Sequence, residues 1–151
     1  MKLDHPESRE QQALIEWARA RAATCEELRL LHSIPNGGFR RQIEAKILIG
    51  EGLLAGMPDL FLPVCKDPGD QVEVSEKYYS DINNRPPGRR LFCPKYFGLY
   101  IEMKYGKAKL SARQAEIQSA LRMQGYKVIT CWSWVHAAQA IEEYLNLRRT
   151  V

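Results

Sequence analysis

The fold is decided by the stretch GLYIEMKYG at residues 98–106. Its odd positions from 99 to 103 are apolar, and its even positions from 100 to 104 carry Tyr, Glu and Lys. This alternation predicts a β-strand that runs from 99 to 105 with its odd positions in the core. Glu102 and Lys104 are two residues apart, so their side chains leave the strand on one face. We therefore expect a carboxylate and an ammonium side by side at the edge of a packed layer.

A second strand is expected at 59–64, where Asp59 follows the turn-forming sequence GMP. If the two strands are neighbours, Asp59 and Glu102 can share one divalent cation, with the ammonium of Lys104 beside them. Carboxylate oxygens are the ligands that Mg²⁺ and Mn²⁺ prefer. A metal held in this way polarises a phosphoryl oxygen and lowers the pKa of a bound water, and a nearby lysine positions that water or offsets charge. Phosphodiester hydrolysis needs these functions. Taken singly, Asp59 could also cap a turn, and Glu102 with Lys104 could form an ordinary surface pair.

The rest of the chain alternates between helical and strand-like patterns. Apolar spacing and capping residues predict helices at 6–23, 40–49, 111–124 and 133–147 and further strands at 28–34 and 127–132. This order predicts an α/β or α+β fold in which helices flank a small mixed sheet. Residues 66–95 lack periodicity and are rich in Pro, Arg and aromatic residues, so we interpret them as an insertion, a long loop with a short helix or hairpin around 72–82.

Composition excludes several classes of protein. The chain has 151 residues, 45% of them hydrophobic, which predicts a single domain over 1–151 with one core and room for one active site. Its apolar runs are far shorter than the roughly 20 residues that cross a bilayer. The first residues lack a secretory h-region, and no C-x-x-C zinc spacing occurs, so we expect a cytoplasmic protein without a zinc finger. A net charge of +4 permits a polyanionic partner without requiring one.

Five sequence blocks in order are similar to a known nuclease family. Pro58-Asp59 followed by Glu102-Met103-Lys104 resembles the PD-(D/E)XK nuclease motif, and its context resembles the virus-type replication-repair nuclease (VRR-NUC) family. The blocks that carry the resemblance are PNGG at 35–38, EGLLAGMPDL at 51–60, GLYIEMK at 98–104, SARQ at 111–114 and GYKV at 125–128. A stand-alone domain of this size resembles phage-encoded members, which implies the cytoplasm of a host cell.

The resemblance implies a restriction-endonuclease-like core and a set of site residues. Asp59 and Glu102 would bind Mg²⁺ or Mn²⁺, the backbone carbonyl of Met103 would complete the metal shell, and Lys104 would be the catalytic lysine. No organic cofactor is expected.

Two further site residues are implied by the same resemblance. The family's first helix carries a glutamate followed four residues later by glutamine, which Glu7 and Gln11 match. Glu10 is the fallback for this glutamate, and both glutamates would also suit the helix dipole. Gln114 matches a glutamine that borders the family's active site, although Ser111-x-x-Gln114 is also a capping box.

Basic residues near these blocks are candidates for phosphate contacts, although each is also compatible with an ordinary solvated charge. They are Arg40, Arg41, Lys107, Lys109 and Arg113. The arginines and aromatic residues of the insertion suit either strand or junction binding or a dimer arm.

The sequence therefore predicts a metal-dependent DNA endonuclease. By resemblance we expect a homodimer that acts on branched DNA such as a four-way junction. The alternatives are a flap, single-strand or non-specific DNA nuclease, and, from another class, a catalytically inactive nucleic-acid-binding module. A soluble α/β protein without a nucleic-acid role is the third alternative.

Overall fold

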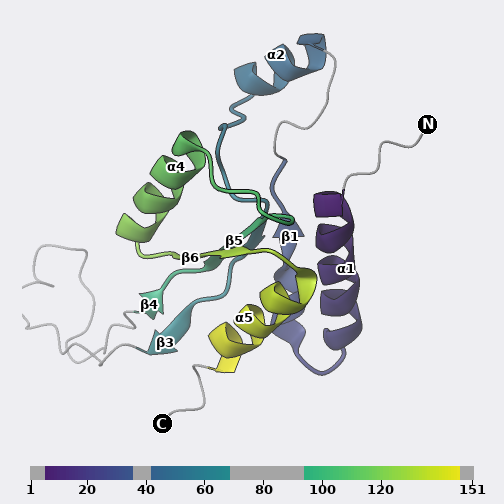
Figure 1. Ribbon diagram of the computed structural model, residues 1–151. Coiled ribbons are helices and arrows are strands. Elements are labelled where there is room, and N and C mark those ends of the chain that lie inside the picture. Colours follow the sequence, from purple (N-terminus) through teal and green to yellow (C-terminus); the bar gives the residue numbers. More distant parts are fainter. Residues whose placement is uncertain (1–5, 36–41, 69–93, 147–151) are drawn as a thin grey trace, which may run out of the picture.

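The computed structural model describes residues 6–35, 42–68 and 94–146 of the chain, and Figure 1 shows how their helices and strands are arranged. In chain order these elements are α1 (Pro6–Arg21), the 3-10 helix η1 (Glu26–Leu30), β1 (His32–Ser33), α2 (Gln42–Gly50), β2 (Leu60–Leu62), β3 (Lys66–Pro68), β4 (Pro94–Tyr96), β5 (Leu99–Met103), α4 (Ala112–Met123), β6 (Lys127–Cys131) and α5 (Trp134–Asn146).

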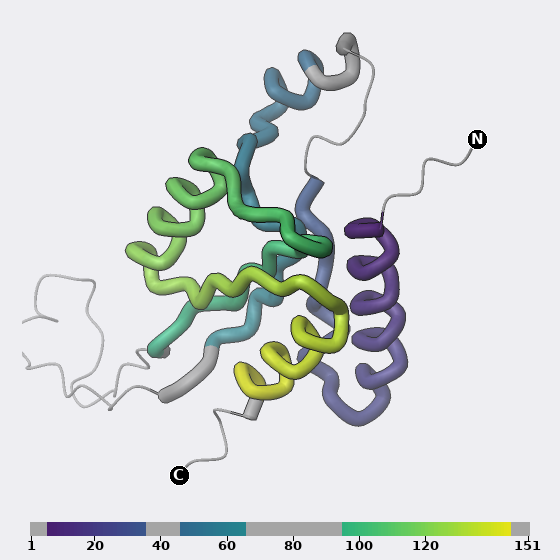
Figure 2. The backbone as a smooth tube through the Cα atoms, viewed as in Figure 1, coloured from purple at the N-terminus to yellow at the C-terminus, as the bar shows by residue number. Residues whose placement is uncertain are grey.

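A four-stranded mixed sheet in the order β1-β2-β5-β6 forms the centre of the fold. β2 is antiparallel to both β1 and β5, whereas β5 and β6 are parallel. Helices α1 and α5 lie side by side on one face of the sheet, and α4 lies on the other (Figure 1). The backbone trace shows α2 extending away from these layers (Figure 2). The predicted fold class, a mixed sheet flanked by helices, is confirmed. The condition for a shared cation, that the strands expected at 59–64 and 99–105 be neighbours, is met by the pairing of β2 with β5.

The core lies between the sheet and the helix pair α1 and α5. The apolar residues of β5, Leu99, Ile101 and Met103, are fully buried there with Leu14 of α1 and Ile141 of α5. Burying side chains of this size stabilises a fold by about 1.5–3 kcal/mol each. The core therefore holds β5 from the face opposite to Glu102.

Glu102 and Lys104 lie side by side as expected, but in the interior of the fold and not at the edge of a packed layer. All five strand residues are buried, and Glu102 and Lys104 are only 1% and 8% exposed. The reason is that α4 covers the face from which Glu102 emerges. Alternation in the sequence identified the two faces correctly but gave no sign that both are covered.

The expected strand at 28–34 is also wrong for most of its length. Residues Glu26–Leu30 form η1, and only His32–Ser33 is a strand. Backbone bonds from Leu28 N to Cys25 O and from Leu31 N to Leu28 O repeat every three residues. With this period, Leu28 and Leu31 both turn toward the core, so an apolar run that resembles a strand is satisfied by a tight helix.

Strands β3 and β4 pair where the 66–95 insertion leaves and rejoins the sheet. Residues 69–93, including the helix or hairpin expected around 72–82, lie outside the described residues. In the ranges that the structure does describe, none of the helices has the length and apolar composition needed to cross a bilayer.

Candidate active site

Glu102 is the central residue of the candidate site. Its Oε1 atom accepts a hydrogen bond from Gln114 Nε2 at 2.6 Å and lies 2.6 Å from Lys104 Nζ. Its Oε2 atom is buried and has no protein partner. Both donors thus converge on one carboxylate oxygen and leave the other without a bond. Because a buried polar atom without a partner costs free energy, such atoms are rare in the interior of a fold.

Asp59 lies beside Glu102 because β2 and β5 pair in antiparallel register, with Leu60 opposite Ile101. Its Oδ2 atom accepts a hydrogen bond of 2.8 Å from the backbone N–H of Met103. This bond fastens the start of β2 to the end of β5. The structure therefore brings together Asp59, Glu102, Lys104 and Gln114, four of the five predicted catalytic residues, around the carboxyl end of β5.

Gly56 explains how the Asp59 segment reaches this place. Its φ angle is +88°, and a Cβ atom there would lie 2.9 Å from Cγ and 3.0 Å from the backbone oxygen of Arg113. A side chain would therefore meet both an unfavourable backbone conformation and the first turn of α4. The glycine lets the 56–59 segment lie directly against the helix that carries Gln114. Sequence reasoning recognised Gly56 as part of a motif but did not predict this contact.

The structure distinguishes the two glutamates of α1. Glu7 Oε1 lies 3.6 Å from Lys104 Nζ, so Glu7 adjoins the site. Glu10 Oε2 instead accepts a 2.7 Å hydrogen bond from the backbone N–H of Trp134, the first residue of α5. Glu10 therefore caps α5 and links it to α1, and the geometry favours Glu7 over the fallback. Glu7 as a metal ligand stays a prediction, since in this structure it contacts the ammonium of Lys104.

The electrostatics of the pair follow from its burial. Burial raises the pKa of Glu102 to about 7, and the nearby negative charges of Asp59 and Glu7 act in the same direction, against the stabilising contact with Lys104. Burial lowers the pKa of Lys104, but its hydrogen bond to Glu102 and the charges of Glu102, Glu7 and Asp59 outweigh it, so that this pKa is raised. Lys104 is thus an ammonium ion near neutral pH.

Three polar side chains follow one another along α4, on the side that faces the sheet. Gln114 is the first of them and forms a capping box with Ser111, which confirms the predicted start of this helix. One turn later, Gln118 is 1% exposed and donates to Thr130 Oγ1, and Arg122 donates to Gln118 Oε1. Thr130 is the register partner of Glu102 on β6. Sequence reasoning missed Gln118, although the spacing of four residues from Gln114 to Gln118 to Arg122 was a usable signal.

The candidate phosphate-binding residues are only partly described. Lys107 and Lys109 are exposed on the loop that leaves β5. Arg113 forms a 2.9 Å ion pair with Glu116 on the surface of α4. Arg40 and Arg41 lie outside the described residues. The structure thus places three of the five basic residues between β5 and the first turn of α4.

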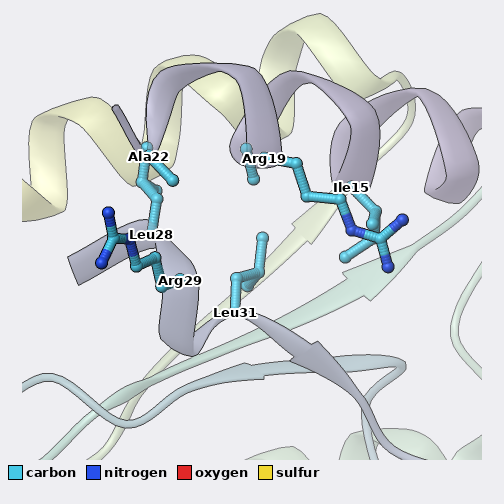
Figure 3. A pocket seen from close by; sticks show the side chains of 7 residues that line it. Ile15, Arg19, Ala22, Leu28, Arg29 and Leu31 are labelled. Atoms are coloured by element: carbon cyan, nitrogen blue, oxygen red, sulfur yellow. The ribbon is translucent and has the colours of Figure 1, made fainter. Parts of the chain in front are cut away.

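A separate pocket lies between the second half of α1 and η1. Its volume is about 390 Å³, and the guanidinium groups of Arg19 and Arg29 flank side chains of Ile15, Leu28 and Leu31 (Figure 3). None of the predicted site residues lines this pocket, so it is distinct from the candidate active site.

No family model and no curated protein matches this sequence. The structure, however, matches a solved structure of a VRR_NUC domain protein with a TM-score of 0.65 and 19% sequence identity. The match covers 95% of this chain and 91% of that chain. The chain has the fold of a VRR_NUC domain. The sequence-predicted fold is therefore confirmed by a comparison that spans nearly the whole of both chains.

The donor set of the site fits a hard divalent cation. Asp59 and Glu102 supply carboxylate oxygens, and the unpartnered Oε2 atom of Glu102 would be satisfied by a cation. Across the part of the chain that the structure describes, no group of three or more His, Cys, Asp and Glu side chains is arranged to hold a metal. A metal here would therefore depend on these two carboxylates, the backbone carbonyl of Met103 and water.

Proposed function

We propose that this protein is a metal-dependent nuclease that hydrolyses phosphodiester bonds in DNA. The observation that carries the proposal is the buried Glu102, whose Oε2 atom has no partner while Lys104 and Gln114 bind its Oε1 atom. Asp59 beside it provides the second carboxylate. The VRR_NUC fold supports the proposal, because the solved structure that shares it is named for a nuclease domain.

Asp59, Glu102 and the backbone carbonyl of Met103 would hold Mg²⁺ or Mn²⁺, which when bound supplies Lewis-acid polarisation of the phosphate and a lowered pKa for the attacking water. Lys104 orients that water or offsets the charge that develops on the phosphate. Gln114 fixes Glu102 through Oε1, so that Oε2 stays directed at the reaction centre. Glu7 holds the ammonium of Lys104 from the side of α1.

We extend the proposal to the substrate and the assembly. A single active site cuts one strand, so processing of a branched DNA such as a four-way junction requires a second copy of the chain. We propose a homodimer that pairs two sites for this purpose. The exposed Lys107 and Lys109 beside the site support a polyanionic substrate.

The proposal is tested by incubating the protein with labelled duplex, single-strand, flap and four-way-junction DNA in Mg²⁺ or Mn²⁺. We expect metal-dependent cleavage, strongest on the junction, and its loss in Asp59→Asn and Lys104→Ala. Calcium, which prefers more ligands and looser geometry, should support binding without cutting. Light scattering should give the mass of a dimer.

Each alternative has its own outcome in this experiment. Cleavage that is equal on all DNAs, or strongest on flaps or single strands, favours a different nuclease substrate. Binding to DNA without cleavage in any metal would overturn the nuclease proposal in favour of an inactive binding module. Cleavage that survives both substitutions would overturn the site assignment, and circular dichroism of both variants shows whether they remain folded.

A further inference from the structure

Two large aromatic side chains are exposed where the site strands end. Tyr105 directly follows Lys104 and is 51% exposed, and Trp132 directly follows β6 and is 44% exposed. The backbone N–H of Lys104 donates to the carbonyl oxygen of Cys131, so these two chain exits lie next to each other. Trp132 is therefore not a core residue. Single exposed apolar residues are common on protein surfaces, so exposure alone assigns no role.

Trp132 differs from an ordinary exposed side chain because its ring is held in place. Its Nε1 atom donates a 2.9 Å hydrogen bond to the carbonyl oxygen of Ala108, which lies 24 residues earlier on the loop that leaves β5. The residues after Trp132 are also held by hydrogen bonds. The backbone N–H of His136 donates to Ser133 Oγ, and the backbone N–H of Trp134 donates to Glu10 Oε2. A ring that is fixed before binding loses little conformational entropy when a ligand stacks on it.

The same hydrogen bond holds the backbone of a loop that carries two lysines. Lys107 and Lys109 flank Ala108, and both are exposed. An indole ring bonded to a loop with two exposed lysines suits single-stranded nucleic acid, because ammonium groups attract phosphates and an aromatic face accepts a base. A base inside a duplex already stacks on both neighbours and cannot offer its face to a protein ring. The chemistry of this surface therefore favours an unpaired nucleotide.

We propose that Trp132 is a stacking platform for an unpaired base next to the cleaved phosphate. This inference rests on the nuclease function proposed above and narrows its substrate to DNA with unpaired nucleotides at a junction, flap or single-strand region. Trp132 acts in binding and positions the strand, whereas Glu102 and Lys104 act at the phosphate. Lys107 and Lys109 hold the backbone of the same strand.

The first test measures stacking directly, in Ca²⁺, with flap and single-strand oligonucleotides that carry 2-aminopurine at successive unpaired positions. Wild-type protein should quench the fluorescence of at least one position, and Trp132→Leu should abolish this quenching and raise Kd roughly 5- to 100-fold, as expected for one base–aromatic stack. Trp132→Phe keeps a ring but loses the bond to Ala108, so it should retain part of the quenching. The Kd for fully paired duplex should be the same for the wild type and Trp132→Leu.

Phe97→Leu is the matched control, because Phe97 is an aromatic residue of similar exposure, 51% against 44% for Trp132, at the opposite end of β5. It should leave both quenching and Kd unchanged. Equal quenching by wild type and Trp132→Leu, with both folded by circular dichroism, would overturn the platform. A lower mass for Trp132→Leu in light scattering, without a change in DNA binding, would also overturn it and assign Trp132 to a contact between chains.

The failure of this inference is distinguishable from the failure of the proposed function. If the wild-type protein cuts DNA but Trp132→Leu binds unpaired and paired DNA as the wild type does, the nuclease stands and the platform falls. If no DNA is cut in Mg²⁺ or Mn²⁺ while Trp132-dependent quenching persists, the platform stands on a binding module and the nuclease proposal falls.

Discussion

The two faces of β5 are both buried but differ in what buries them. On the side of α1 and α5, Ile101 belongs to a cluster of buried apolar side chains. On the side of α4, one carboxylate oxygen of Glu102 accepts a hydrogen bond from Gln114, and the other is left without a partner. One strand thus stabilises the fold through one face and carries the candidate chemistry on the other. Stability and activity should therefore respond to different substitutions in adjacent residues.

The largest expected effect is a loss of DNA cleavage when the polar face of β5 is changed. Asp59→Asn keeps an oxygen that can accept the bond from Met103 but removes a charge from beside Glu102, so it should lower cleavage by roughly 10³-fold if the carboxylate holds a catalytic metal. The melting temperature of the metal-free protein should change little, because the substitution relieves a repulsion of Glu102 but also removes an attraction to Lys104. Gel assays of cleavage and thermal melts with and without Mn²⁺ check both parts. A variant that cuts DNA at the wild-type rate would show that the polar face of β5 does not carry the chemistry.

The converse substitution lies on the apolar face. Ile101→Ala removes a fully buried side chain and should lower the free energy of unfolding by about 3 kcal/mol. The cleavage rate per folded molecule should change by only a few-fold, because the side chain lies on the face of β5 opposite to Glu102. Urea unfolding and cleavage at a temperature where the variant is folded are the measurements. A large loss of activity in the folded variant would show that the faces are not independent.

The next effect concerns pH and the metal-free protein. The folded-state pKa of Glu102 is raised to about 7 from its ordinary 4.5, so the folded state holds a proton that the unfolded state releases. The contribution of this group to stability is therefore present at low pH and is lost as pH rises through 7, by about 2 kcal/mol between pH 5 and 8. Urea unfolding in EDTA at several pH values measures it, and Glu102→Gln should flatten the profile. A stability that instead rises with pH only in the wild type would contradict this assignment.

The smallest effect tests whether α1 contributes to the site through Glu7 and to stability through Glu10. Glu10→Ala should lower the free energy of unfolding by about 1 kcal/mol, because it removes the cap of α5 while the rate per folded molecule is kept. Glu7→Gln should leave the melting temperature unchanged and reduce kcat, because Glu7 contacts Lys104 at an exposed end of the helix. The two variants are matched, being glutamates one turn apart, and a reversed outcome would reassign the site glutamate to Glu10.

The sequence predicted the parts of the site that depend on local spacing. Asp59 after Pro58 and the alternation around Glu102 predicted two strands, whereas their pairing entered only as a condition for a shared cation, because no local pattern shows which strands are neighbours. It could not predict that Glu10 binds Trp134, because the two residues are 124 positions apart and neither carries a local signal of the contact. The run around Leu28 was misread because three-residue and two-residue periods are indistinguishable over so few apolar residues.

The burial of Glu102 and Lys104 has a consequence for ionic strength. Mobile ions screen charges that they can surround, so added salt acts weakly on a pair that is 1% and 8% exposed and strongly on the lysines of the neighbouring loop. Salt should therefore weaken the capture of a polyanion at Lys107 and Lys109 while leaving the balance of charges at the reaction centre nearly untouched. The charges that attract the substrate are thus exposed to solvent and sensitive to salt, whereas the charges at the reaction centre are buried and insensitive to it.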